Sequence, residues 1–209
     1  MTTAVSVETT PDRTDLMHVV RASVRLGILQ CVLIALFAVL QPRLDGVLEL
    51  VICGSILIIG LAATILLPGL WTNARTIEGI AGAAGIGFGA AIVFLAVDVV
   101  LFQPLGIYTN RWLEIGGGSN WWYHPVWWMV GTYVPCMGAW ILAAQTAKRG
   151  DTNPVGALVV VFAVALVLLA LAVAIGVPFA RFGLGGFSVA ILPALAVVTI
   201  LSVLGARRR

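Results

Sequence analysis

Residues 155–177 read VGALVVVFAVALVLLALAVAIGV, a stretch without a polar side chain. About 20 apolar residues are what an α-helix needs to cross a hydrocarbon core about 30 Å thick. Lipid offers the backbone no hydrogen-bond partner, so such a run must form a helix or belong to a closed barrel. A barrel strand would alternate polar and apolar side chains, and this run does not. The stretch therefore predicts a transmembrane helix.

Five further apolar runs accompany it. The six predicted transmembrane helices cover about 24–41, 47–67, 79–103, 125–146, 155–177 and 184–205. Helix-breaking pairs or prolines are predicted to end or begin them at Gln41-Pro42, Pro68-Gly69, Gln103-Pro104, Asn153-Pro154 and Pro178. The predicted fold class is all-α, a polytopic integral membrane helical bundle of six transmembrane helices.

The composition of the whole chain agrees with this class. Of 209 residues, 61% are hydrophobic and 10% are charged, and the mean hydropathy is +1.08. Soluble domains carry about 25% charged residues, so this chain cannot cover a water-facing surface. A soluble protein, a disordered chain, a disulfide scaffold and a nucleic-acid-binding domain are excluded. We interpret Cys31, Cys53 and Cys136, which lie inside apolar runs, as small buried hydrophobic residues.

The distribution of arginine and lysine predicts the orientation. Six spans place nine basic residues on one side, namely Arg13, Arg21, Arg25, Arg75, Lys148, Arg149, Arg207, Arg208 and Arg209. Three lie on the other side, namely Arg43, Arg111 and Arg181. Because cytoplasmic loops carry the excess of basic residues, both termini are predicted in the cytoplasm of a multi-pass cell-membrane protein.

The two ends of the chain are predicted to lie on the membrane surface. Residues 1–23 form a polar segment with an interfacial lead-in helix, which Thr10-Pro11 begins and whose first turn contains Asp12 and Asp15. Residues 206–209 form a basic anchor suited to anionic lipid, and residues 24–205 form the transmembrane domain.

The third span carries a stripe of small residues. Ala81, Gly85 and Gly89 share one helical face, and small residues at this spacing let two helices approach closely in lipid. The stripe predicts helix packing, either at a seam between subunits or within the chain's own bundle.

Asp98 is the only acidic residue well inside an apolar run. A carboxylate facing lipid is unfavourable, so Asp98 is predicted to face the bundle interior, a cavity or a partner. Arg111, Arg181 or His124 could reach it from their loops, and Glu49 could join the same cluster. A functional polar site and a structural ion pair both fit.

The connection 104–124 is long and aromatic, and five aromatic residues surround the start of the fourth span: Trp121, Trp122, Tyr123, Trp127 and Trp128. They indicate an aromatic belt at headgroup depth, or a pocket for a lipid, quinone, pigment or small cation. The candidate ligand-binding residues are Glu49, Asp98, Arg111, Trp121, Trp122, His124 and Tyr133. No metal site is predicted, and the sequence requires no cofactor.

Three functions follow from these features. The first is a non-catalytic structural or accessory subunit of a larger membrane complex, which packs through the Gly-rich third span and the aromatic outer loop. Its partners would be the lipid bilayer, other membrane subunits or a second copy, and no nucleic acid. The second is a small-molecule binding or transport module with an outer site. The third is an intramembrane enzyme acting on a lipid or isoprenoid through Asp98, but the chain contains no hydrolase or phosphate-loop motif.

Overall fold

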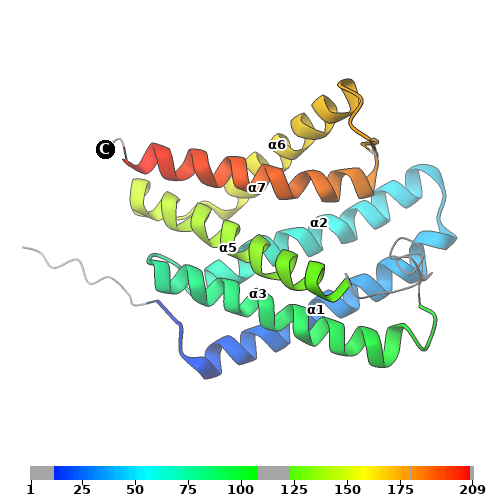
Figure 1. The fold of residues 1–209 in the computed structure, drawn as a ribbon, viewed down its shortest axis with the longest axis horizontal. Helices are drawn as coiled ribbons and strands as arrows, with labels where there is room; N and C mark the ends of the chain where they lie inside the picture. Colours follow the sequence, from blue (N-terminus) through cyan, green and yellow to red (C-terminus); the bar gives the residue numbers. More distant parts are fainter. Residues whose placement is uncertain (1–11, 108–122, 179, 208–209) are drawn as a thin grey trace, which may run out of the picture.

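The computed structural model describes residues 12–107, 123–178 and 180–207 as a bundle of helices running side by side (Figure 1). Its elements are α1 (Leu16–Leu40), the 3-10 turn η1 (Gln41–Arg43), α2 (Gly46–Trp71), α3 (Ile77–Val97), the π-helical turn η2 (Asp98–Phe102), α5 (Tyr123–Arg149), α6 (Pro154–Ala174) and α7 (Leu184–Arg207). Every regular element in this part of the chain is helical, and six helices are long and apolar enough to cross a membrane. The predicted fold class is confirmed, and the chain is a multi-spanning membrane protein. The side on which the termini lie stays a prediction.

Successive helices alternate in direction, so the connections gather at two ends of the bundle (Figure 1). We call the end that holds Asp12, the α2–α3 connection and the α5–α6 connection the terminal end. The far end holds the α1–α2 and α6–α7 connections and the turn that follows η2. The sequence predicts that the terminal end faces the cytoplasm.

The helix boundaries depart from the sequence prediction at the second and fifth spans. The prediction that Pro68-Gly69 ends the second span is wrong, because α2 continues to Trp71 with Pro68 buried inside it. Pro68 cannot donate an N–H to the Thr64 carbonyl four residues earlier, and membrane-spanning helices tolerate such a proline because neighbouring groups can satisfy the freed carbonyl. In the fifth span, α6 ends at Ala174, before Pro178.

The start of the first helix also differs from the prediction. The helix begins at Leu16, where the Asp15 carboxylate accepts a hydrogen bond from the His18 N–H at 2.9 Å. Asp12 therefore lies outside α1, not in its first turn. Its carboxylate instead accepts hydrogen bonds from the N–H groups of Arg75, Thr76 and Gly79 at 3.2, 3.1 and 3.0 Å, and from the Thr76 hydroxyl. Asp12 thus accepts hydrogen bonds from N–H groups at the start of α3 that have no partner within the helix, and it links the segment before α1 to α3.

We expect Asp12→Ala to lower the free energy of unfolding by roughly 1–3 kcal/mol, because backbone donors at the start of α3 lose a charged acceptor. Thermal unfolding in detergent measures the effect. Asp45→Ala is the matched control, because Asp45 precedes α2 but makes no side-chain capping bond. Equal melting temperatures for the two variants would show that the Asp12 contacts contribute nothing.

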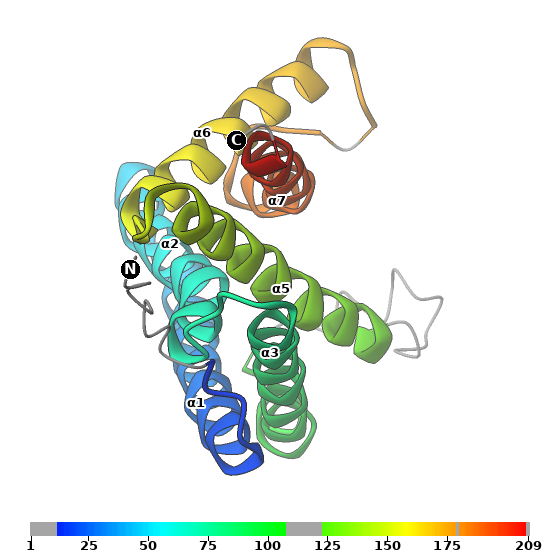
Figure 2. The same ribbon diagram turned by 90° about the vertical axis from the view of Figure 1, so that its left-hand side faces the viewer.

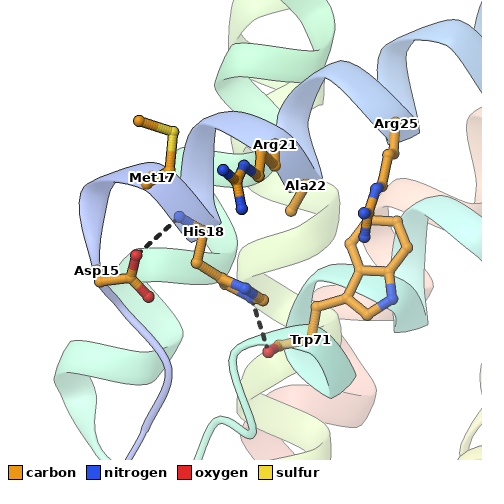
Figure 3. Close-up of a pocket in the computed structure, with 7 residues that line it drawn as sticks. All are labelled: Asp15, Met17, His18, Arg21, Ala22, Arg25 and Trp71. Atoms are coloured by element: carbon orange, nitrogen blue, oxygen red, sulfur yellow. Dashed lines mark hydrogen bonds between the residues drawn. The ribbon is translucent and has the colours of Figure 1, made fainter.

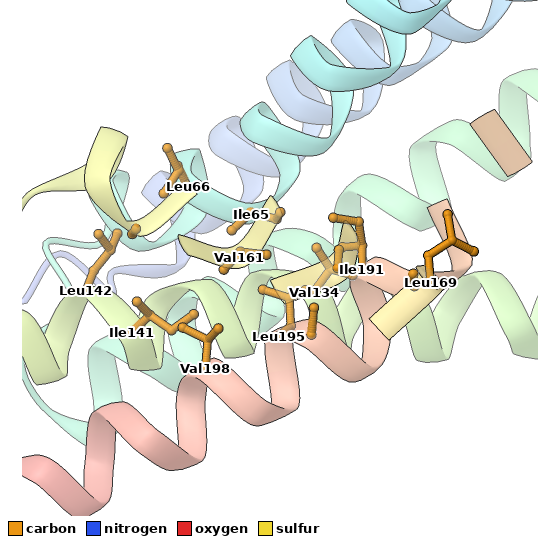
Figure 4. Packing of buried hydrophobic residues seen from close by; sticks show 14 residues of the cluster. Ile65, Leu66, Val134, Ile141, Leu142, Val161, Leu169, Ile191, Leu195 and Val198 are labelled. Carbon is orange, nitrogen blue, oxygen red and sulfur yellow. The ribbon is translucent and has the colours of Figure 1, made fainter. Parts of the chain in front are cut away.

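The largest hydrophobic cluster joins α2, α5, α6 and α7 (Figure 4). Ile65, Ile141, Val161, Ile191 and Leu195 are almost fully buried in it. Helix α6 contributes a single stripe at four-residue spacing, namely Ala157, Val161, Ala165 and Leu169, and exposes much of the remaining helix. This pattern is that of a peripheral helix whose other faces meet lipid.

Helix α3 packs against α1 and against α5 (Figure 2). Leu26 of α1 and Ile86 and Ala90 of α3 form a buried cluster between the first pair. In the same view, the first turns of α5 project beyond α3 and α7. This projection leaves one face of α5 open.

Candidate functional site

Four of the residues predicted to bind a ligand lie in the described part of the chain. Glu49 is on α2, Asp98 begins η2, and His124 and Tyr133 are on α5. The remaining three, Arg111, Trp121 and Trp122, lie outside the described residues.

Asp98 is fully buried, with 0% of its surface exposed, at the point where α3 changes into the π-helical turn. The wider turn brings residues five apart onto one face. Gln103 therefore donates its backbone N–H to the Asp98 carbonyl at 2.9 Å and its side-chain amide to the Asp98 carboxylate at 2.7 Å. Phe94 lies four residues before Asp98 and Phe102 four residues after it, and their rings pack edge to face. The carboxylate is thus bonded within its own turn, in a closed apolar setting.

The other described candidates use different partners. Glu49 accepts a hydrogen bond from the Gln41 amide at 3.0 Å. Tyr133 donates its hydroxyl hydrogen to the Leu192 carbonyl at 2.7 Å and so ties α5 to α7. The His124 ring lies 6.5 Å from the Trp128 ring, measured between centroids. The hydrogen-bonding groups of Glu49 and Tyr133 are therefore engaged outside the Asp98 turn.

The predicted small-residue stripe on α3 faces the first helix along part of its length. A Cβ atom on Gly89 would lie 2.5 Å from the Ser23 hydroxyl, and one on Gly85 would lie 3.8 Å from Val19. Both neighbours belong to α1, whereas Ala81 is exposed. In this structure Gly85 and Gly89 therefore lie at a seam inside the chain.

A second glycine seam, between α3 and α5, was missed by the sequence reasoning. Pro135 has no N–H, so the Gly131 carbonyl four residues earlier receives no helical hydrogen bond from it. A Cβ on Gly87 would lie 2.1 Å from that carbonyl oxygen and 2.3 Å from the Pro135 ring. Only glycine fits at this distance. The sequence does show a glycine four residues before a proline in one span, which could have indicated a close helix contact. It does not show that Gly87 of α3 is the residue in contact.

The open face of α5 forms a shallow groove of about 480 Å³. Its lining consists of Trp128, Met129, Thr132, Tyr133, Cys136 and Met137. Met129 is 70% exposed and Trp128 is 43% exposed. Thr132 donates its hydroxyl hydrogen to the Trp128 carbonyl at 2.7 Å, so the groove is mainly apolar. A large, adaptable, apolar partner matches this lining.

A second cavity, of about 310 Å³, lies at the terminal end between α1 and the last residue of α2 (Figure 3). Its lining consists of Asp15, Met17, His18, Arg21, Ala22, Arg25 and Trp71. The His18 Nε2 atom lies 3.0 Å from the Trp71 carbonyl oxygen and is placed to donate to it. We call this cavity the terminal-end pocket.

Sequence reasoning counted the arginines of this pocket only as orienting charges. His18, Arg21 and Arg25 follow one another at spacings of three and four, which places them on one helical face. That periodicity was a usable signal. The contribution of Trp71, which is distant in sequence, needed the tertiary structure.

Ligands for a metal ion do not gather in the described ranges, where no group of three or more His, Cys, Asp or Glu side chains could hold one. All three cysteines are free thiols, with Cys31 and Cys53 buried and Cys136 half-buried.

Comparisons with protein-family models, curated proteins and solved structures find no match to this chain.

Proposed function

We propose that this chain is a non-catalytic accessory subunit of a larger membrane complex and that it binds a neighbouring transmembrane helix along the groove on α5. The observation that carries the proposal is the chemical contrast between the exposed faces of α5 and α6. The exposed residues of α6 include Val159, Val160, Leu166 and Val167, which are ordinary lipid-facing side chains. The groove on α5 instead presents tryptophan, methionine, threonine, tyrosine and cysteine side chains.

These side-chain types are suited to a protein neighbour. Aromatic residues and methionine are enriched in protein interfaces, and unbranched methionine adapts its shape to an irregular partner. Trp128 is held in place by an edge-to-face contact with Phe88 of α3, with ring centroids 6.4 Å apart. It therefore offers a positioned aromatic anchor beside the flexible Met129 side chain.

The burial of Asp98 supports a non-catalytic role. A carboxylate that acts on a substrate must reach it, whereas Asp98 has no exposed surface and bonds to Gln103 of the same turn. In this position Asp98 shapes the far end of α3. The proposed accessory role therefore rests on the open groove on α5, and Asp98 has a structural role in this proposal.

The test is the particle mass after mild detergent extraction from the native membrane. We expect the wild-type chain to migrate in a particle larger than the 22.0 kDa chain with its detergent. Thr132→Trp fills the groove and should release the chain from this particle. Val160→Trp adds the same side chain to α6, at a position that is 50% exposed, and should leave the particle intact.

Thermal unfolding of both variants in detergent checks that the fold survives each substitution. A wild-type chain that migrates alone, with neither partner nor second copy, would contradict the proposal. Equal retention of the particle by the two variants would contradict the assignment of the groove.

A further inference from the structure

We propose that the terminal-end pocket binds a phosphate group, and that in the membrane this phosphate belongs to the headgroup of an anionic phospholipid. The proposal concerns a surface separate from the α5 groove and does not depend on the proposed function. It begins with the shared face of α1. His18, Arg21 and Arg25 all extend from this helix toward the cavity above Trp71 (Figure 3).

The charges that line the pocket favour an anion. Arg21 and Arg25 supply two permanent positive charges, and neither side chain makes a hydrogen bond or ion pair with another residue of the described ranges. The one acidic residue in the lining, Asp15, caps α1 through the His18 N–H. Two guanidinium groups beside one cavity match a phosphate, because each planar fork can donate two parallel hydrogen bonds to its oxygens.

The depth of the pocket points to a lipid as the source of the phosphate. The contact between His18 and the Trp71 carbonyl puts His18 level with the end of α2. Arg25 lies seven residues further along α1, about 10 Å deeper at the helical rise. Its side chain extends away from α1 and lies beside the Trp71 ring, as Figure 3 shows. A long arginine side chain near the end of a span can keep its charge in the headgroup region, and tryptophan is typical of the same depth.

The rim of the pocket fits the remainder of a phospholipid. Ala22, between the two arginines in sequence, is buried beside the site. Deeper along the face of α1 that carries Arg21 and Arg25, Ile28 and Val32 are 53% and 51% exposed, so the acyl carbons can lie against them while the phosphate meets the arginines. The exposed guanidinium groups are then neutralised where an unpaired charge would otherwise approach hydrocarbon.

The experiment places the full chain in nanodiscs and counts retained lipids by native mass spectrometry. We expect wild-type protein from nanodiscs containing phosphatidylglycerol to retain an anionic lipid. The double variant Arg21→Gln/Arg25→Gln should retain it at least about tenfold less, because both phosphate contacts are lost. Arg75→Gln removes one charge at the same end of the bundle but outside the pocket, and should change retention less than about twofold.

Thermal unfolding in phosphatidylcholine nanodiscs reports whether the double variant is folded, and the single variants Arg21→Gln and Arg25→Gln replace it if it is not. Equal lipid retention by wild type and pocket variants overturns the proposal. A separate arm adds inorganic phosphate to wild-type protein in phosphatidylcholine nanodiscs. Stabilisation by inorganic phosphate without retention of phosphatidylglycerol overturns the lipid assignment and identifies a soluble phosphate as the occupant.

Discussion

Gly138→Val is expected to separate α2 from α5 and to leave little correctly folded protein. A Cβ on Gly138 would lie 1.9 Å from the Ile65 carbonyl oxygen and 2.8 Å from its carbon. These are backbone atoms, so no side-chain rotation relieves the clash, and one helix must move. Because helices in lipid are held together mainly by close packing, a shift here loses contacts along the seam, where Gly69 lies against Ala139.

Overpacking of this kind destabilises a protein by about 3 kcal/mol or more when the backbone has to move. For a chain of this size, that corresponds to a decrease in melting temperature of roughly 6–12 °C. Size-exclusion chromatography and thermal unfolding in detergent measure the yield and the shift. Gly185→Val is the matched control, since a Cβ on Gly185 of α7 meets nothing within 4 Å. Similar melting temperatures for wild type and Gly138→Val would disprove the close approach of α2 and α5.

The six spans were predictable because each one obeys a local rule. An apolar run of membrane-spanning length must satisfy its backbone internally, and α6 does so without a polar side chain between Gly156 and Ala174. The start of α1 was not predictable in this way. Asp12 reads locally as a first-turn residue, but its carboxylate bonds to the start of α3, more than sixty residues away in sequence.

In the candidate site, too, features that depend on nearby residues were predictable and features that depend on tertiary contacts were not. The burial of Asp98 follows from an isolated acid in an apolar run, whereas the π-helical turn that brings Gln103 to it leaves no pattern that we recognised. The sequence indicated one glycine face on α3. The contact of Gly87 with Gly131 depends on which helix lies next to α3, and a single sequence does not contain that information.

Thiol labelling is expected to give an all-or-none difference between the two ends of the bundle. Leu105 follows η2 at the far end and is 69% exposed, and Asp151 lies in the exposed connection between α5 and α6 at the terminal end. We predict that Leu105→Cys reacts with a membrane-impermeant maleimide in intact cells. Asp151→Cys should react only after the membrane is made permeable. The wild-type chain measures the background from its three native cysteines.

Asp151 suits this substitution better than Asn153, two residues later, because Asn153 accepts the Gly156 N–H at 2.8 Å and its replacement would uncap α6. The two possible failures have different meanings. Labelling of both positions from the same side would contradict six spans, because α5 lies between Leu105 and Asp151 and must place them on opposite sides if it crosses the membrane. Labelling with the sides exchanged would keep the six spans and reverse the orientation. The terminal-end pocket would then meet the outer leaflet, and its phospholipid in the cell would come from that leaflet, whereas the nanodisc experiment would be unchanged because both of its leaflets hold the same lipids.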